Sequence, residues 1–388
     1  MRTPSKRGCF SVTSAKFAKL FEQVELHDGI KLQNRIVLAP MTHSSSNPDL
    51  SVSDAELTYY ERRTDKLGLA ITAVAHVMPG GIGFQNQFAA FGEENLPGLT
   101  QLASSLKKGG AKAVLQIFHA GIQGPRALVP NGDVVGPSAI ELQDGSQSRE
   151  LTNEEIESIV TDFGHATKLA IRAGFDGVEI HGANGYLIQQ FFSGWSNRRQ
   201  DKWGGSVEAR LTFPLAVVDE VQRAAAEGTK EPFIVGYRFS PEEPQEEGLT
   251  MEHTFALIQA LNTKNLSYLH VSLMEYASKP RRGGDLNRTR LEQIVEAAAG
   301  TPVIGVGSVH TPEQAVEAIE LGAAMVALGR ELIVEPDWVE KVESGREADI
   351  ALSLTKDDQQ RLVIPDQLWG MIVGLPGWFP VVEAETAE

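Results

Sequence analysis

The chain has 388 residues, of which 42% are hydrophobic and 22% charged, and a formal net charge of -16. This composition is that of a soluble globular protein; no apolar run reaches the roughly 20 residues of a membrane span, and the acidic balance argues against nucleic acid as a partner. A single cysteine, Cys9, builds no disulfide, zinc cluster or iron-sulfur centre, so we expect no metal site and a reducing, cytoplasmic setting.

The N-terminus is basic. Its first twenty residues contain five Lys or Arg and no acid, but they lack the apolar centre of a secretory signal. We expect residues 1–16 to form a disordered leader. Residues 24–32 then alternate apolar and polar side chains around Asp28-Gly29, which predicts a hairpin that caps the closed end of a barrel.

Eight apolar, β-branched runs predict eight strands. They cover residues 35–39, 69–77, 112–118, 177–180, 233–239, 268–273, 302–306 and 325–328. Helical patterns lie between them, most clearly at residues 152–173, 207–226, 251–261, 291–299 and 312–321. Thr152 and Glu155 open the first of these helices as a capping box.

Buried strands that alternate with helices indicate a parallel sheet covered on both faces. Eight repeats predict an α/β fold, a closed (β/α)8 TIM barrel with an N-terminal capping hairpin. The alternative is an open doubly wound sheet. Its dinucleotide fingerprint is poorly met, because His310 stands where the third glycine belongs after Gly305 and Gly307, and no acid follows at the required spacing.

We predict one barrel domain over residues 17–350 and a C-terminal tail over residues 351–388. The tail carries Trp369, Trp378 and Phe379, so we expect it to pack on its own barrel or on a neighbouring subunit. The longest interruption, residues 120–151, is expected to be a lid or a substrate wall at the barrel mouth.

A polar motif ends the fourth strand and leads into an amphipathic segment at residues 187–192. His181, Asn184 and Tyr186 stand at the end of a barrel strand, where catalytic groups collect. The first two can donate hydrogen bonds to one carbonyl or anionic oxygen, and Tyr186 can give a proton. Taken alone, a satisfied strand-end histidine and a core tyrosine explain the motif equally well.

Two polar clusters follow the last two strands. Gly307-Ser308 and Gly329-Arg330 stand where barrels commonly hold a phosphate, which Arg330 could clamp with two hydrogen bonds. The alternative is packing glycines with a surface arginine. Because both clusters fall at the expected strand ends, the sequence favours a phosphate site.

Other strand ends bring Pro40-Met41-Thr42, Gln116 and Arg238 toward the same mouth. A flat heterocycle with polar edges and a phosphate tail would satisfy this hydroxyl, carboxamide and cation together. Beside an electron-accepting ring, Arg238 would favour the negative charge that accumulates on reduction.

The chain resembles the old yellow enzyme family of FMN-dependent NAD(P)H oxidoreductases over about residues 17–345. The resemblance depends on residues 34–42 (NRIVLAPMT), 116–121 (QIFHAG) and 181–187 (HGANGYL). Its most specific stretch is residues 196–206 (SNRRQDKWGGS), which Arg210 follows.

This resemblance implies bound FMN, with NADH or NADPH as the reductant. The flavin would be lined by Ala39, Pro40, Met41, Thr42 and Val74, and Thr42 would bond its carbonyl edge. Its pyrimidine side would be held by Gln116 and Arg238, and its phosphate by Gly307, Ser308, Gly329 and Arg330.

The resemblance also implies a ping-pong reduction of the activated C=C bond of α,β-unsaturated carbonyl compounds. His181 and Asn184 would bind the substrate carbonyl, and Tyr186 would donate the proton. Two positions depart from one branch of the family: Ser44 stands in place of a substrate-side tyrosine, and no arginine follows Arg361 in the tail. A residue contributed to a neighbour within a homo-oligomer would therefore differ, with Trp378 as the candidate.

Two further polar segments can be explained by a structural role. We interpret Asn197, Arg198, Arg199 and Asp201 as a network that fixes a loop, not as catalytic groups. Arg281 and Arg282 either meet the phosphates of a nicotinamide cofactor or lie in a solvated loop.

Other functions stay open. The flavin could serve another reaction of the superfamily, such as dienoyl thioester reduction or amine oxidation, or could be bound without turnover. A non-redox lyase or isomerase that binds a sugar phosphate would use the same barrel. Visible colour separates the last of these from the others, because a sugar-phosphate enzyme is colourless.

Overall fold

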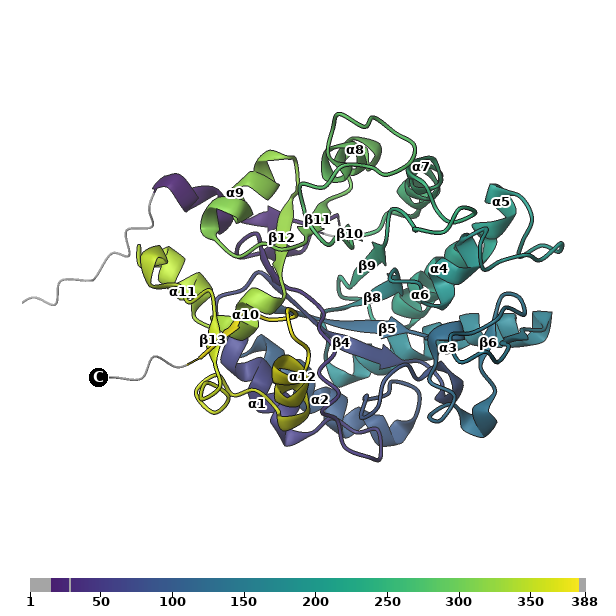
Figure 1. Ribbon diagram of the computed structural model, residues 1–388, viewed down its shortest axis with the longest axis horizontal. Coiled ribbons are helices and arrows are strands. Elements are labelled where there is room, and N and C mark those ends of the chain that lie inside the picture. Colours follow the sequence, from purple (N-terminus) through teal and green to yellow (C-terminus); the bar gives the residue numbers. More distant parts are fainter. Residues whose placement is uncertain (1–14, 28, 384–388) are drawn as a thin grey trace, which may run out of the picture.

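The computed structural model describes residues 15–27 and 29–383, and its centre is a closed barrel of eight parallel strands (Figure 1). Around the barrel the strand order is β10-β11-β12-β3-β4-β5-β8-β9. The strands are β3 (Ile36–Leu38), β4 (Leu69–His76), β5 (Lys112–Phe118), β8 (Gly177–Gly182), β9 (Ile234–Phe239), β10 (Tyr268–Val271), β11 (Val303–Val306) and β12 (Met325–Leu328). All eight predicted strands and the TIM barrel are confirmed.

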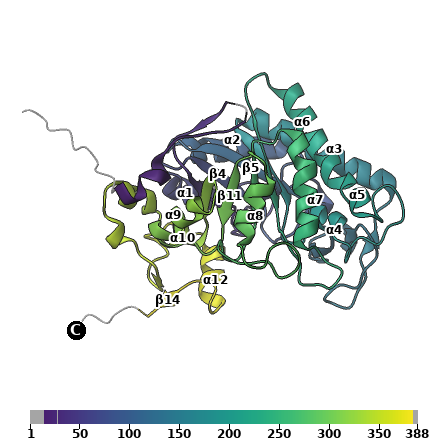
Figure 2. The ribbon, with the colours of Figure 1, turned by 90° about the horizontal axis from the view of Figure 1, so that it is seen from above.

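The predicted hairpin is also confirmed. Strand β1 (Val24–Glu25) pairs antiparallel with β2 (Lys31–Leu32), and the apolar side chains of the hairpin pack on the inward-facing residues of the barrel. In Figure 2 the purple hairpin and α12 lie at opposite ends of the barrel. The hairpin therefore closes the N-terminal end and leaves the C-terminal strand ends as the open mouth.

Most of the predicted leader lies outside the described residues. Its last two residues, Ala15 and Lys16, begin a 3-10 helix, Ala15–Phe21, in which Phe17 and Leu20 are fully buried. Lys16 Nζ also lies 2.6 Å from Glu313 Oε1. Ala15 and Lys16 therefore belong to a helix that packs on the barrel through the buried Phe17 and Leu20.

Helices surround the barrel. They are α1 (Asp54–Arg63), α2 (Leu96–Lys107), α3 (Asn153–Ala173), α4 (Leu187–Phe192), α5 (Val207–Arg210), α6 (Thr212–Gly228), α7 (Met251–Leu261), α8 (Arg290–Ala297), α9 (Pro312–Glu320), α10 (Arg330–Val334), α11 (Trp338–Glu343) and α12 (Asp366–Gly374). The helix predicted at residues 207–226 is divided at Leu211. Pro214 explains the break, since it has no N–H to donate to the carbonyl of Arg210.

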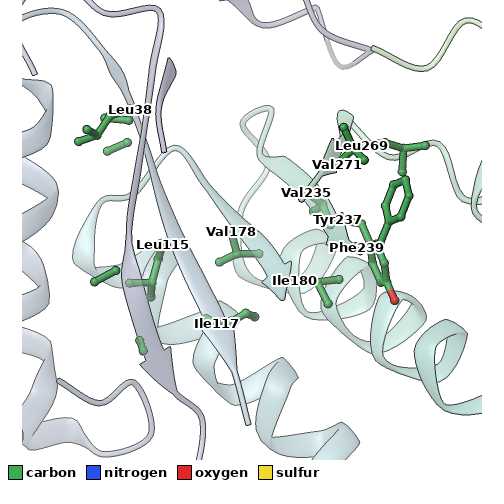
Figure 3. Packing of buried hydrophobic residues seen from close by; sticks show 14 of the residues in the cluster. Leu38, Leu115, Ile117, Val178, Ile180, Val235, Tyr237, Phe239, Leu269 and Val271 are labelled. Carbon is green, nitrogen blue, oxygen red and sulfur yellow. The ribbon is translucent and has the colours of Figure 1, made fainter. Parts of the chain in front are cut away.

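The main core lies between the strands and the helices. Outward-facing strand residues such as Leu115, Ile117, Val178 and Ile180 are buried there against the helical layer (Figure 3). Helix α4 is buried at all six positions, so residues 187–192 are not amphipathic as predicted. The reason is that the long loop after β5 covers the outer side of α4 through β6 (Val135–Gly136) and the turn Gly121–Gln123.

The capping box at the start of α3 provides a test of local stability. Thr152 Oγ1 accepts from the amide of Glu155, and a Glu155 carboxylate oxygen accepts from the amide of Thr152 at 2.8 Å. Thr152→Ala leaves that amide of the first turn without its side-chain partner, so we expect the free energy of unfolding to fall by about 1 kcal/mol. Denaturant unfolding measures it. Thr161→Ala, in the middle of the same helix, should change it by less than about 0.5 kcal/mol.

The C-terminal tail packs on the barrel of its own chain. Leu354, Leu362, Leu368 and Ile372 are buried in the main core. Strands β13 (Leu354–Thr355) and β14 (Val381–Val382) pair with each other, and the Leu362 carbonyl accepts from the guanidinium of Arg63 on α1 at 2.6 Å. Figure 1 shows the tail in yellow beside α1 and α10. Within the described ranges, no helix is both long and apolar enough for a membrane crossing.

The long loop of residues 120–151 is anchored to the body of the protein. Arg199 donates from Nη1 to the carbonyls of Pro137 and Leu151, at 3.0 and 2.7 Å, and from Nη2 to Asp201 at 2.6 Å. Asn197 Nδ2 donates to the carbonyls of Phe191 and Trp203. Asn197, Arg199 and Asp201 therefore form a loop-fixing network, as predicted, whereas Arg198 takes part through its backbone amide, which donates to Ser138 Oγ. The long loop is a fixed wall of the mouth.

Candidate active site

The barrel interior below the mouth contains a buried polar layer. Neighbouring strands β5, β8, β9 and β10 each contribute one side chain, respectively Gln116, Glu179, Arg238 and His270. Glu179 accepts from Gln116 Nε2 at 2.6 Å and from His270 Nδ1 at 2.9 Å. Burial acts to raise the pKa of Glu179, but His270, Arg238 and Gln116 outweigh it and hold that pKa below its ordinary value. The layer therefore contains a fixed carboxylate beside a fixed guanidinium.

His181 is the last but one residue of β8 and is only 3% exposed. Burial, together with the positive charge of Arg238, holds the pKa of His181 well below its ordinary value, so its imidazole is neutral. Its Nδ1 accepts from the amide of Ala183 at 3.3 Å. The ring proton therefore belongs on Nε2, which can donate one hydrogen bond.

Asn184 lies at the mouth with its side chain held from one end. Its φ of 57° is left-handed, a conformation that asparagine tolerates better than most residues. Its Oδ1 accepts from Ser272 Oγ at 2.8 Å, and Ser272 Oγ accepts from Arg238 Nη2 at 3.2 Å. The backbone amide of Asn184 donates to Ser240 Oγ at 2.8 Å. Because the carbonyl end is occupied, the NH2 group is the end left to donate to a ligand.

Tyr186 packs beside His181. The ring centroids of these residues are 5.1 Å apart, and the Tyr186 ring meets the edge of Phe118 at 5.0 Å. Val74 belongs to the same small apolar cluster. Burial raises the pKa of Tyr186 to about 12, so its hydroxyl keeps its proton at neutral pH. The structure thus brings together the three side chains of the polar motif and Val74.

Ser272 offers a test of how Asn184 is oriented. Ser272→Ala removes the shorter of the two hydrogen bonds to Asn184 Oδ1, the other coming from Ser240 Oγ at 3.4 Å, and a neutral hydrogen bond contributes about 0.5–1.5 kcal/mol. Anionic phenols would bind to the NH2 group of Asn184, whose orientation the Ser272 hydrogen bond fixes. We therefore expect them to bind roughly 3- to 10-fold more weakly to the variant. Titration with a phenol measures the affinity. The matched control is Ser278→Ala, whose hydroxyl donates to the Glu275 carbonyl at 2.7 Å, and its affinity should stay unchanged.

A second buried network supports the segment after β3. His43 Nδ1 lies 3.1 Å from Glu56 Oε1, and His43 Nε2 lies 3.0 Å from the hydroxyl of Tyr60. That hydroxyl accepts from the amide of Ala73 at 2.7 Å, at the point where the register of β4 shifts between Ile71 and Val74. The network therefore fixes the backbone beside both Thr42 and Val74.

The clusters predicted to bind phosphate do meet. Arg330 Nη2 donates to Ser308 Oγ at 3.2 Å, and Arg330 Nη1 donates to the carbonyl of Trp378 at 3.0 Å. Gly307 has a φ of 133°, and a Cβ there would lie 2.8 Å from the amide nitrogen of Glu275 and from the carbonyl oxygen of Leu273. Only glycine fits that position, which lets the loop after β10 close on the loop after β11. The tail, through the Trp378 carbonyl, is in contact with these two clusters.

The residues present fit FMN. The Nε of Arg238 is buried and has no hydrogen-bond partner among the described residues, and the acceptor edge of a pyrimidine ring would satisfy it. A Cβ on Gly329 would lie 3.2 Å from the sulfur of Met41, so the loops after β3 and β12 line one space. Ala39 and Pro40 are buried, and Thr42 is half-buried, at the same mouth. A ring over the polar layer and a phosphate at Arg330 match these donors.

Arg281 and Arg282 differ in their surroundings. The guanidinium of Arg282 donates to the carbonyls of Glu243, Gln245 and Glu246, so it fixes the loop after β9. The backbone amide of Arg281 donates to Glu242, while its side chain is exposed. Arg282 is therefore a structural residue.

Several residues of the site were missed from the sequence: Glu179, His270, Ser272, Ser240, His43, Glu56 and Tyr60. Glu179 sits in an apolar strand, and a buried acid in such a strand needs partners. The position of Glu179 in the sequence could therefore have predicted a polar interior of the barrel. The other six residues belong to the site only through contacts that the closed barrel creates.

The chain is similar in sequence to a known family and to its members. A sequence model of the NADH:flavin oxidoreductase / NADH oxidase family matches residues 19–349. A relative from Bacillus subtilis (strain 168), named probable NADH-dependent flavin oxidoreductase YqiG, is 51% identical over 367 residues, which are 94% of this chain and 98% of the relative. The NADH:acrylate oxidoreductase of Vibrio harveyi is 40% identical over 362 residues, which are 91% of this chain and 36% of that longer protein.

The fold of the chain is also similar to that of a solved structure. The old yellow enzyme from Trypanosoma cruzi superposes with a TM-score of 0.72 at 27% identity, covering 85% of this chain and 93% of that chain. The similarity therefore extends over most of both chains.

Proposed function

The chain belongs to the NADH:flavin oxidoreductase / NADH oxidase family, which includes the old yellow enzymes, and we propose that it reduces the activated C=C bond of α,β-unsaturated carbonyl compounds. Family membership makes it an FMN-dependent oxidoreductase that uses NAD(P)H, which sets aside the non-redox lyase or isomerase. The proposed cycle is ping-pong, so the nicotinamide leaves before the alkene binds.

Bound FMN supplies the hydride chemistry, since it can take a hydride from NAD(P)H and pass one to an alkene carbon. The proposed task of His181 and Asn184 is to hold the substrate carbonyl with two hydrogen bonds. Both groups are fixed before the substrate arrives, by the Ala183 amide and by Ser272. Donors fixed in advance stabilise the negative charge that develops on that oxygen without reorganising.

Tyr186 is the proposed proton donor to the other alkene carbon. Its hydroxyl is protonated at neutral pH, because burial raises its pKa to about 12. Its ring is fixed against Phe118 and His181. This convergence of a neutral imidazole, an oriented amide and a protonated phenol on one mouth is the observation that carries the proposal.

The other predicted residues have proposed roles toward FMN. Thr42, Gln116 and Arg238 would hold the polar edges of the ring, and Arg238 would favour negative charge on it. Ring and phosphate would be enclosed by Ala39, Pro40, Met41, Val74, Gly307, Ser308, Gly329 and Arg330. The Arg238 Nε without a partner supports the first assignment, and the Arg330–Ser308 hydrogen bond supports the second.

We further propose that the protein is cytoplasmic and forms a homo-oligomer through its tail. Leu352, Val373, Leu375 and Val382 are large apolar residues of the tail that are between 42% and 53% exposed. A second copy could cover such exposed apolar side chains. Light scattering tests this, since a monomeric mass would contradict it.

Anaerobic half-reactions test the catalytic proposal. NADH should bleach the visible absorbance of the protein, and an enone such as cyclohexenone, added after the NADH is consumed, should restore it at a rate that increases with enone concentration. Restoration by oxygen alone, with none by enones, would overturn the proposed substrate class and leave an NADH oxidase. An absence of bleaching would leave a protein that binds flavin without turnover.

A further inference from the structure

A cavity of about 650 Å³ opens beside Asn184 and Ser240. Its walls are the long loop after β5, helix α4 with the residues that follow it, and the loop after β9. We propose that this cavity is a subsite for a positively charged group of the substrate, such as a protonated or quaternary amine attached a few bonds from the enone carbonyl. The inference rests on the proposed function, because that carbonyl would lie at Asn184.

The cavity adjoins the proposed substrate site through a short chain of hydrogen bonds. Ser240 Oγ accepts from the amide of Asn184 at 2.8 Å. The next amide, that of Gly185, donates to Gln189 Oε1 at 2.9 Å, and Gln189 Nε2 donates to the carboxylate of Glu243 at 2.6 Å. All five of these residues line the cavity. Since one glutamine side chain separates the carboxylate of Glu243 from the backbone beside Asn184, a short substituent on a substrate held at Asn184 would enter the cavity.

The walls carry more negative than positive charge. Among the described residues of the lining, four are acidic and Arg126 is the one basic residue. Two of the acids have cationic partners, since Asp144 lies 3.8 Å from Arg126 and Glu242 pairs with Arg290. The four acidic residues are Glu141, Asp144, Glu242 and Glu243. In the described part of the chain, the first and the last of these are in no ion pair, so the walls keep a surplus of negative charge.

Glu243 is a buried carboxylate whose hydrogen-bond donors are all uncharged. It is 8% exposed, and it accepts from Gln189 Nε2 at 2.6 Å, from the amide of Leu249 at 3.0 Å and from the hydroxyl of Ser193. The guanidinium of Arg282 donates to the backbone carbonyl of Glu243 and not to its carboxylate. Buried charges in proteins are generally paired with an opposite charge. A cation in the adjoining cavity would supply the partner that Glu243 lacks.

Other residues of the lining also suit an ammonium group. Trp195 is half-buried there, and the face of an indole attracts a cation that lies within about 6 Å of its centre. Gln245 Oε1 is buried and has no hydrogen-bond partner among the described residues, so an N–H donor would satisfy it. Arg126 is already engaged, since its Nη1 donates to the carbonyl of Gly132 at 2.6 Å. The lining thus combines an aromatic ring, carboxylates and an unsatisfied acceptor.

The apolar part of the lining sets the order of preference among substrates. Ile122, Ile140 and Leu142 also line the cavity, so an uncharged substituent would be accepted through contact with these side chains. A substituent that carries a carboxylate or a phosphate would be repelled by the acidic walls. The expected order is therefore cationic, then neutral, then anionic.

Phenols with matched tails test this order on the intact flavoprotein. Tyramine and para-propylphenol have tails of equal length that end in an ammonium or a methyl group, para-hydroxyphenylpropionate ends in a carboxylate, and the meta isomers direct each tail elsewhere. At one of the two ring positions the ammonium compound should bind about tenfold more tightly than the propyl compound, and the carboxylate compound about tenfold more weakly. The ammonium advantage should shrink as salt is added. Equal affinities of the ammonium and propyl compounds at both positions would overturn the inference.

Substitutions in the walls show whether the cavity causes the preference. Glu243→Gln should lower the ratio of tyramine affinity to para-propylphenol affinity about fivefold, because it removes the buried charge. Trp195→Leu keeps an apolar contact without the aromatic face and should lower the ratio about threefold. Unsubstituted phenol should keep its affinity in both variants. Glu154→Gln, which removes an exposed acid on α3, is the control and should keep the ratio. An unchanged ratio in both wall variants would contradict the inference.

Turnover separates this inference from the proposed function. An enone that bears a trimethylammonium group should be reduced with a higher kcat/KM than its isosteric tert-butyl counterpart. A protein that reduces both enones equally well would contradict the inference and support the proposed function. A protein that reduces no enone would contradict the proposed function, and calorimetry with benzyltrimethylammonium would still decide the inference. Binding that Glu243→Gln weakens would support a cation subsite, and an absence of binding would contradict it.

Discussion

Tyr186→Phe should slow the alkene half-reaction by roughly 10²- to 10⁴-fold, the usual contribution of a positioned general acid, and leave flavin reduction by NADH unchanged. The phenol ring of Tyr186 is held by Phe118 and His181. Phenylalanine preserves that packing and removes only the hydroxyl. The nicotinamide half-reaction transfers a hydride without this proton, so it has no need of the group.

Stopped-flow measurement of both half-reactions checks this result. Tyr237→Phe is a suitable control, because Tyr237 is a fully buried core tyrosine on β9 and should alter neither rate constant. Equal losses in the two half-reactions of Tyr186→Phe would remove the proton-donor role. The pH dependence gives an independent check: burial raises the pKa of Tyr186 to about 12, so the alkene step should keep its rate through the range near pH 10 where an ordinary tyrosine ionises.

Replacing His181 and Asn184 together by alanine should weaken the binding of phenols by roughly a hundredfold or more. A hydrogen bond to a charged oxygen contributes about 1.5–3 kcal/mol, and a phenolate presents the charge that the substrate oxygen acquires. Both donors are oriented in advance, by Ala183 and by Ser272, so their loss removes a prepared site. The visible spectrum during a phenol titration reports the affinity.

The control for this pair is His165→Ala, an exposed histidine on α3 that should leave phenol affinity unchanged. FMN content should also stay the same in the double variant, because neither side chain is assigned to the phosphate or pyrimidine contacts. An unchanged phenol affinity would mean that the carbonyl of the substrate binds elsewhere.

The barrel was predictable because its strands are short apolar runs that alternate with helical patterns along the chain. Each of the eight was found, and the Asp-Gly turn identified the hairpin. Helix bounds were harder to predict, because a single residue can divide a helix. Pro214 divides the helix predicted at residues 207–226 into α5 and α6. Helix α4 was misjudged as amphipathic, because the loop that buries its outer side is distant in sequence.

Site residues that stand at strand ends could be predicted from the sequence. Site residues that meet only because the barrel closes could not. Gln116 and Arg238 could be identified as neighbours of one mouth. The hydrogen bonds that join Gln116 to His270 through Glu179, and the influence of Arg238 on the pKa of Glu179, depend on the order β5-β8-β9-β10 around the barrel, which no local pattern encodes. The same holds for Ser272, which directly follows β10 and donates to Asn184 from 88 positions away in the sequence.

We propose that this barrel holds FMN with its ring over the polar layer and its phosphate at Arg330. The most direct measurement is the visible absorption spectrum of the purified protein, followed by release and identification of the pigment. We expect a yellow protein with one FMN per chain, and a marked loss of that pigment in Arg330→Ala. A colourless protein that takes up no added FMN would contradict it.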